Sequence, residues 1–168
     1  PGDDFGVIAS GPTYPDNTSC LNAIAVLEKY KISCSKNIYE SLNSEVSETP
    51  DKDDRIFSRS EFKLIAKPQK ALLKAAEIVE KNKFSSLILS DSIEGESNDI
   101  GKVHAAIVKQ VNKYAQPSKA PLCILSGGET TVTIGSTNGK GGRNTQFLLS
   151  LAIELDSAAN VYAISCDT

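Results

Sequence analysis

The second half of the chain alternates between segments with helical and with strand-like patterns of hydrophobic residues. Apolar residues recur at helical spacing over residues 69–82, 96–114 and 144–155, and Pro68 is suited to begin the first helix. Apolar runs predict strands at 62–66, 86–90, 122–125 and 161–165, and alternation predicts an edge strand at 130–134. This order favours an α/β fold with a mostly parallel sheet and helices on both faces.

The first 58 residues show a weaker pattern. We expect a short strand at 5–9 and helices at 19–30 and 36–43. Asp16, Asn17 and Thr18 are the candidates for capping the first of these helices. The polar stretch 44–58, which contains Pro50, predicts a linker or domain boundary.

Composition narrows the class of protein. Hydrophobic residues make up 40 % and charged residues 23 % of the chain, as in globular domains, and the formal net charge is −3. This charge gives no reason to expect nucleic acid as a partner. No apolar run reaches membrane-spanning length, so we expect a cytoplasmic protein without a membrane partner. The four scattered cysteines and single histidine argue against a zinc site, and Cys123 and Cys166 are expected to be buried, inert thiols.

The chain contains no methionine, opens on the loop-like Pro1-Gly2-Asp3-Asp4 and closes just after a predicted strand. We therefore expect it to be a fragment of a longer polypeptide.

Two glycine clusters are the strongest candidates for a binding site. The first, Ser126-Gly127-Gly128-Glu129, follows a predicted strand, where backbone N–H groups could approach an anion and Glu129 would supply a carboxylate. A tight turn between two strands explains the same residues equally well.

The second cluster, residues 139–144, begins a predicted helix and carries Gly139, Lys140, Gly141, Gly142, Arg143 and Asn144. A helix N-terminus attracts anions, and Arg143 could clamp a carboxylate or phosphoryl group. The alternative is a loop of solvated cations with Asn144 as a cap. The cluster matches neither Gly-x-x-x-x-Gly-Lys-Ser/Thr nor Gly-x-Gly-x-x-Gly, so neither common nucleotide-binding loop is present here.

Three further features have plainer explanations beside the functional one. Asp167 follows a predicted strand and could be catalytic, bind metal or serve a turn. Glu94 and Glu96 could bind metal, although acids at a helix start more often favour the helix dipole. His104 lies within a predicted helix with no nucleophile motif beside it in sequence, which favours a packed histidine.

Taken together, these motifs resemble class II glycerate kinases (glycerate 2-kinases) of the MOFRL family, historically also labelled hydroxypyruvate reductases. The motifs that carry the resemblance run in order across the chain: Gly2-Asp3-Asp4, Ile8 to Thr13, Glu94 to Glu96, Ser126 to Val132, Gly141 to Asn144 and Asp167-Thr168. One departure follows Arg143-Asn144, where the family usually has Gln-Glu and this chain has Thr145-Gln146.

The resemblance implies two α/β domains with the active site between them. Residues 1–58 would end the first domain, and residues 59–168 would form a truncated MOFRL-like domain. It further implies phosphorylation of D-glycerate by ATP with Mg²⁺ in the full-length protein. An upstream Gly-Lys-Ala segment and a downstream Asp-Gly continuation would be missing, so the isolated chain would be inactive.

The resemblance suggests roles for the candidate residues. Arg143 would stabilise charge, and Glu129 and Asp167 would bind magnesium or activate the substrate hydroxyl. The residues expected to bind substrate or phosphate are Gly127, Gly128, Gly141, Gly142, Asn144, Ser10, Gly11 and Thr13.

Two alternatives remain at this point. One is a hydroxypyruvate reductase that uses NADH or NADPH, whose dinucleotide site would lie in the missing domain. The other is an inactive anion-binding fragment, which could self-associate as a homo-oligomer through an apolar face left open by that domain.

Overall fold

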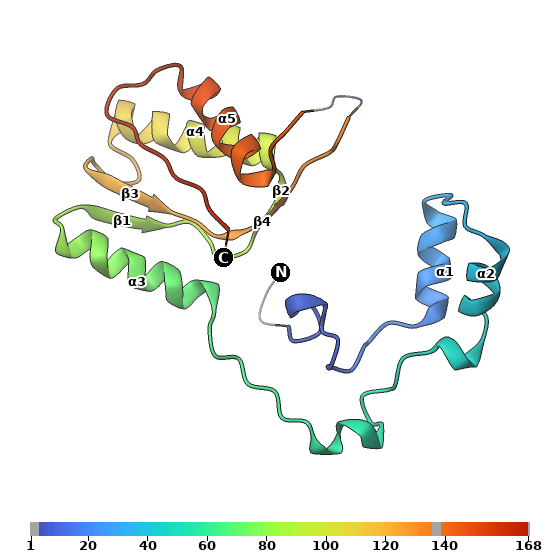
Figure 1. The fold of residues 1–168 in the computed structure, drawn as a ribbon. Coiled ribbons are helices and arrows are strands. Elements are labelled where there is room, and N and C mark those ends of the chain that lie inside the picture. Colours follow the sequence, from blue (N-terminus) through green and yellow to red (C-terminus); the bar gives the residue numbers. More distant parts are fainter. Residues whose placement is uncertain (1–3, 136–138, 168) are drawn as a thin grey trace. The chain divides into compact units, whose positions relative to one another are not determined.

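The computed structural model describes residues 4–135 and 139–167 (Figure 1). Gly2, Asp3 and Thr168, which belong to the motifs above, lie outside the described residues. The chain divides into two compact units, an N-terminal unit up to Ile65 and a C-terminal unit from Ala66 onward.

The C-terminal unit is built from parallel strands and helices. Its helices are α3 (Pro68–Lys81), α4 (Ser97–Tyr114) and α5 (Arg143–Leu155), and its strands are β1 (Ser85–Ile88), β2 (Ile93–Glu96), β3 (Leu122–Leu125) and β4 (Gly128–Thr131). β1 pairs in parallel with β3, and β2 pairs in parallel with β4. Figure 1 shows α3 on one side of β1 and β3, with α4 and α5 on the other. The predicted α/β class with parallel strands is thus confirmed.

The two ladders are linked where the chain bends between them. Leu89 N–H donates to the Leu125 carbonyl at 2.9 Å, and Gly127 N–H donates to the Ser90 carbonyl at 2.8 Å. Ile93 N–H then donates to the Gly127 carbonyl at 3.0 Å, just before the β2–β4 pairing begins. The Ser126-Gly127 segment therefore lies at the bend, immediately beyond the carboxyl end of β3.

Helices α4 and α5 pack closely because Gly101 presents no side chain to α5. A Cβ built on Gly101 would lie 2.8 Å from the Phe147 carbonyl oxygen and 2.8 Å from Ser150 Cβ. Two polar contacts fix the same crossing, since the Ser150 hydroxyl donates to the Asn98 carbonyl at 2.7 Å and Gln146 donates to Asn98 Oδ1 at 2.9 Å. Ser150 is buried.

The N-terminal unit is mainly helical. Its elements are the 3₁₀ helices η1 (Ile8–Ser10), η2 (Glu45–Ser47) and η3 (Arg55–Arg59) and the α-helices α1 (Cys20–Lys29) and α2 (Lys36–Leu42). The N-cap of α1 is Ser19, whose hydroxyl accepts from Asn22 N–H at 3.3 Å. Asp16, Asn17 and Thr18 therefore do not cap this helix, and Asp16 instead accepts from Thr18.

Three predicted strands are absent from the described residues. Residues 5–9 form a turn and η1, because Ser10 and Gly11 have φ values of 63° and 50° and reverse the chain. Residues 62–66 have no regular structure, and Phe62 packs instead against Tyr14 with ring centroids 4.8 Å apart. Residues 161–165 are irregular, and Tyr162 and Ile164 are about 90 % exposed.

The predicted edge strand is shifted, because β4 ends at Thr131 rather than at Ile134. In the described part of the chain, no helix combines the length and the apolar character that crossing a bilayer requires.

Candidate active site

A cavity of about 610 Å³ opens in the C-terminal unit at the bend between its two ladders. Its lining comes from residues 126–130, α5 and residues 164–167, together with Ile93 of β2 and with Ile100 and His104 of α4. Six of the eleven site residues predicted from the sequence line this cavity: Gly127, Gly128, Glu129, Arg143, Asn144 and Asp167. The location agrees with the general rule that ligands of parallel sheets bind at the carboxyl ends of strands.

Arg143 is the charged centre of the cavity. Its Nη1 donates to Glu129 Oε1 at 2.6 Å, and its Nη2 lies 3.8 Å from Asp167 Oδ1. The hydrogen bond and charge of Glu129, and then the charge of Asp167, raise the pKa of the guanidinium above its already high value. The Arg143 side chain remains 41 % exposed, so an anionic ligand could reach it.

The two glycines of the first cluster act chiefly through close backbone approach. Gly127 N–H is engaged by Ser90, so it is not free to bind an anion. Gly128 has a φ of 150°, and a Cβ there would collide with the backbone of Ile93. Gly128 thus allows β4 to pair with β2, which sets the position of the adjacent Glu129.

The second glycine cluster is placed differently from the prediction. Gly141 and Gly142 precede α5 but are not among the residues that line the cavity. Gly142 N–H donates to the Thr145 hydroxyl at 2.8 Å, so it caps the helix instead of pointing to an open site. Asn144 does line the cavity, where its Oδ1 accepts from the Ser165 hydroxyl at 2.6 Å.

The structure adds to the site a histidine that the sequence pattern does not place there. His104 of α4 is only 9 % exposed and lines the cavity, where its Nε2 lies 3.1 Å from Ser126 Oγ. The two residues are 22 positions apart, so sequence spacing gave no signal of the pair. His104 is packed, as expected, but it has a hydroxyl partner.

Glu96 and Cys123 lie outside this cavity, whereas Cys166 lines it. The Glu96 carboxylate accepts from Thr133 N–H at 2.8 Å and so holds the chain that follows β4. Cys123 is half-buried, and Cys166 is exposed and lines the cavity, so the expectation that Cys166 is buried is wrong. Its segment forms no covered strand, which explains the exposure.

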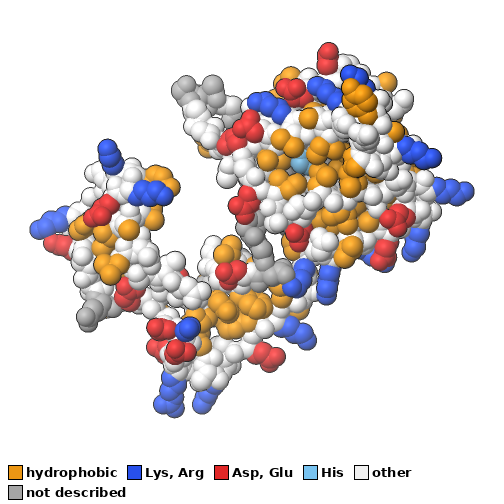
Figure 2. Space-filling view, turned by 180° about the vertical axis from the view of Figure 1, so that it is seen from behind, with side chains coloured by type: hydrophobic (Ala, Val, Ile, Leu, Met, Phe, Trp, Pro, Cys, Tyr) orange, Lys and Arg blue, Asp and Glu red, His pale blue; other side chains and the backbone are white. Residues whose placement is uncertain are grey.

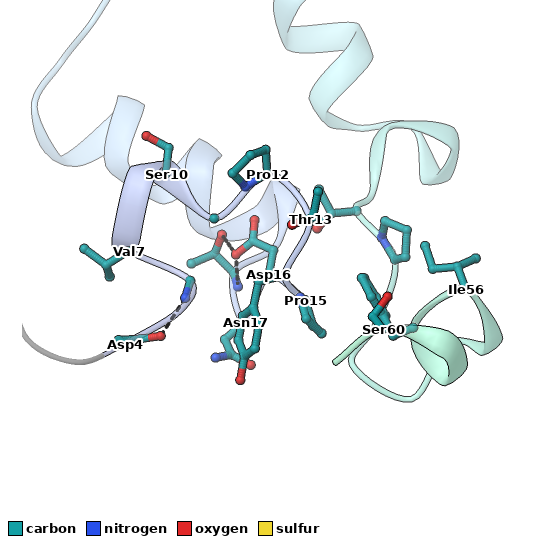
Figure 3. Close-up of a pocket in the computed structure, with 17 residues that line it drawn as sticks. Asp4, Val7, Ser10, Pro12, Thr13, Pro15, Asp16, Asn17, Ile56 and Ser60 are labelled. Carbon is teal, nitrogen blue, oxygen red and sulfur yellow. Dashed lines mark hydrogen bonds between the residues drawn. The ribbon is translucent and has the colours of Figure 1, made fainter. Parts of the chain in front are cut away.

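Ser10, Gly11 and Thr13 line a separate cavity of about 640 Å³ within the N-terminal unit (Figure 3). Asp4 Oδ1 accepts from Gly6 N–H at 2.8 Å, and Asp16 accepts from both the N–H and the hydroxyl of Thr18. These Thr18 hydrogen bonds lower the pKa of Asp16 below its usual range.

Two parts of the chain match models of different protein families. Residues 122–168 match the model of the MOFRL family, and residues 1–43 match a domain of unknown function, DUF4147. Residues 122–168 are therefore similar to the MOFRL family. The MOFRL segment holds every predicted site residue that lines the 610 Å³ cavity, whereas Ser10, Gly11 and Thr13 lie in the DUF4147 segment.

Relatives carry two different names. The chain is 41 % identical over 169 residues to an Agrobacterium vitis protein provisionally named hydroxypyruvate reductase, covering 100 % of this chain and 38 % of that protein. It is 35 % identical over 167 residues to the D-glycerate 2-kinase of Thermotoga maritima, covering 99 % of this chain and 38 % of the kinase.

A solved structure shares the fold. The crystal structure of a Thermotoga maritima glycerate kinase matches with a TM-score of 0.67 and 34 % identity, over 94 % of this chain and 36 % of the kinase. The predicted resemblance to MOFRL-type glycerate kinases is confirmed, and the chain spans less than half the length of these relatives.

Proposed function

We propose that the full-length polypeptide containing this chain transfers the terminal phosphoryl group of ATP to the 2-hydroxyl of D-glycerate. Relatives of this chain carry the name glycerate 2-kinase, and one such kinase shares its fold. The observation that carries the proposal is Arg143, which lines the cavity and forms ion pairs with both Glu129 and Asp167. One cation between two carboxylates suits phosphoryl transfer, which depends mainly on positioning and on charge neutralisation.

Arg143 is the group we assign to the phosphoryl oxygens. Its guanidinium stays charged at all relevant pH values, and its planar donors match the geometry of phosphate. In the structure, Glu129 and Asp167 lie close enough to offset its charge. An incoming phosphate would compete with these carboxylates for the same donors. Binding of the anion would therefore release carboxylate oxygens, which could then bind Mg²⁺ or accept a proton.

Glu129 and Asp167 fit the role of Mg²⁺ ligands by chemistry. Mg²⁺ in phosphoryl-transfer sites is held by one or two carboxylates together with substrate phosphates and water. Among the described residues, no group of three or more Asp, Glu, His or Cys side chains is arranged so that it could hold a metal ion by itself. When bound, Mg²⁺ would neutralise charge on the phosphoryl oxygens. The carboxylate that does not bind metal could accept the proton of the 2-hydroxyl.

The remaining assignments are part of the same proposal. Gly141, Gly142 and Asn144 would bind an anion near the N-terminus of α5, for which Gly142 N–H would have to exchange its hydrogen bond to Thr145 for one to the anion. Ser10, Gly11 and Thr13 would contribute from the first domain. Residues 1–58 would belong to that domain and residues 59–168 to the MOFRL-like domain. A cytoplasmic location, inactivity of the isolated chain and its self-association stay predictions.

The test is production of 2-phosphoglycerate from D-glycerate, ATP and Mg²⁺ by the full-length polypeptide, beside this chain alone. Arg143→Ala should lower turnover by about 10³-fold, by analogy with arginines that stabilise phosphoryl-transfer transition states. Lys109→Ala is the matched control, because Lys109 pairs with Glu154 and does not line the cavity. Turnover of the Arg143 variant within threefold of wild type would contradict the assigned role.

The reductase name of the Agrobacterium relatives supports a second candidate, reduction of hydroxypyruvate with NADH or NADPH. No Gly-x-Gly-x-x-Gly sequence occurs in this chain, so its dinucleotide site would have to lie elsewhere in the polypeptide. Nicotinamide oxidation on hydroxypyruvate, with no phosphorylation of D-glycerate, would replace the kinase proposal.

A further inference from the structure

The hydrogen bonds of His104 fix its tautomer. Nδ1 lies 2.8 Å from the backbone carbonyl oxygen of Ile100, and Nε2 lies 3.1 Å from Ser126 Oγ. A carbonyl oxygen can only accept, so Nδ1 must carry the proton. In the neutral ring Nε2 is then an acceptor, and the Ser126 hydroxyl donates to it.

The ring has little freedom to break this arrangement. His104 is 9 % exposed, and Phe147 of α5 packs against it at 85°, with ring centroids 5.0 Å apart. Figure 2 shows the imidazole, in pale blue, surrounded by hydrophobic side chains. α4 and α5 are also held together at Gly101 and Ser150, so the histidine is presented to the cavity on a packed helix pair.

This geometry determines what Ser126 can offer a ligand. Its only proton is given to His104, so its oxygen can act toward the cavity only as an acceptor. Ser126 is itself exposed and lines the cavity three residues before Glu129. A hydroxyl oxygen acting only as an acceptor fits a ligand hydroxyl, and it does not favour a carboxylate or phosphate, which has no proton to donate.

We propose that Ser126 accepts a hydrogen bond from the non-reacting hydroxyl of a dihydroxy acid substrate, and that His104 is the positioning residue that orients Ser126. The inference rests on the proposed function, under which that group is the 3-hydroxyl of D-glycerate. Activation of Ser126 as a nucleophile is disfavoured, because the Nδ1 proton faces a neutral carbonyl and not the carboxylate that stabilises an imidazolium in hydrolase triads.

The experiment compares D-glycerate with D-lactate, the same 2-hydroxy acid without the 3-hydroxyl, in the full-length polypeptide. The quantities measured are kcat and KM for D-glycerate and the inhibition constant of D-lactate. Ser126→Ala should raise KM for D-glycerate about three- to tenfold, as expected for one neutral hydrogen bond, and leave the D-lactate constant within about twofold. Ser92→Ala is the matched control, an exposed serine of the same unit that does not line the cavity.

His104→Phe should raise KM for D-glycerate by a similar factor, and the double variant should be no worse than either single one, because both remove the same interaction. In ¹⁵N-histidine-labelled protein, the resonances of the wild type that are missing from His104→Phe belong to His104. These resonances should show that Nδ1, and not Nε2, carries the proton.

Equal weakening of both ligands by Ser126→Ala would indicate a merely structural role and overturn the inference, as would no change in either. If the wild type fails to phosphorylate D-glycerate, the proposed function fails separately. Direct calorimetric binding of the two acids then decides the inference, and equal or absent binding overturns it.

Discussion

Gly101→Ala is the sharpest test of how the candidate active site is held. The new Cβ would lie 2.8 Å from a backbone oxygen of Phe147, 2.8 Å from Ser150 Cβ and 3.0 Å from Ser150 Oγ. Two of these three contacts involve atoms that no rotamer change can move, so the helices must separate by several tenths of an ångström. Overpacking of this kind costs about 1–3 kcal/mol. Because all three contacts are 3.0 Å or shorter, we expect a cost in the upper part of this range, about 2–3 kcal/mol. Alanine recovers up to about 1 kcal/mol of helix propensity, which leaves a net loss of about 1–2 kcal/mol.

The assay is hydrogen–deuterium exchange of the α4 and α5 peptides in the full-length polypeptide, because local opening is measurable where unfolding is not two-state. A loss of 1–2 kcal/mol should speed exchange through local opening about 5- to 30-fold. The control is Gly139→Ala, where a Cβ meets nothing within 4 Å. Exchange in Gly101→Ala at the wild-type rate would refute the argument that the glycine sets the distance between α4 and α5.

Two further predictions test other parts of the chain. Gly128→Ala should break the β2–β4 pairing and release Glu129, because its φ of 150° and the collision with Ile93 leave no room for a side chain. Hydrogen–deuterium exchange in β2 and β4 should become faster, and an unchanged exchange rate would contradict the prediction. Burial and then the charge of Glu48 raise the pKa of the Cys20 thiol, which lowers its thiolate fraction at a given pH. Glu48→Gln should therefore speed alkylation of Cys20 by iodoacetamide at pH 8 and leave exposed Cys166 unchanged, and equal rates for Cys20 in both proteins would count against the contact.

The helices were predictable because each signal was local. Pro68 begins α3, as the sequence analysis expected, and α1, α2, α4 and α5 begin and end within one residue of their predicted bounds. The buried face of α4 is harder to predict, since the hydrophobic side chains of Val103 and Tyr114 are more than half exposed. Periodicity locates a helix well, but its buried face depends on the neighbours it meets.

The strands show the opposite dependence, because a strand exists only when another backbone pairs with it. β1 and β3 were predicted and pair with each other. β2 was missed, since its sequence Ile-Glu-Gly-Glu has little apolar character, yet Gly128 brings β4 into register beside it. Residues 161–165 have the sequence of a strand, but no strand pairs with them among the described residues.

The site residues also fall into two groups. Some are predicted by the local sequence, and others are identified only by a contact between distant segments. Glu129 and Arg143 were predicted because each lies in a glycine cluster at the end of a predicted element, and the structure joins them at 2.6 Å. His104 was not predicted as a site residue, because its hydrogen-bond partner Ser126 follows a different element, the strand β3. The helix pattern places His104 in α4, but only the pairing that ends β3 at Leu125 places Ser126 against it. A histidine that is merely packed and one that orients a substrate-binding hydroxyl have the same sequence neighbours. They differ in whether a side chain from another element forms a hydrogen bond with Nε2. Ser126→Ala tests this contact, because it removes the hydroxyl that donates to Nε2.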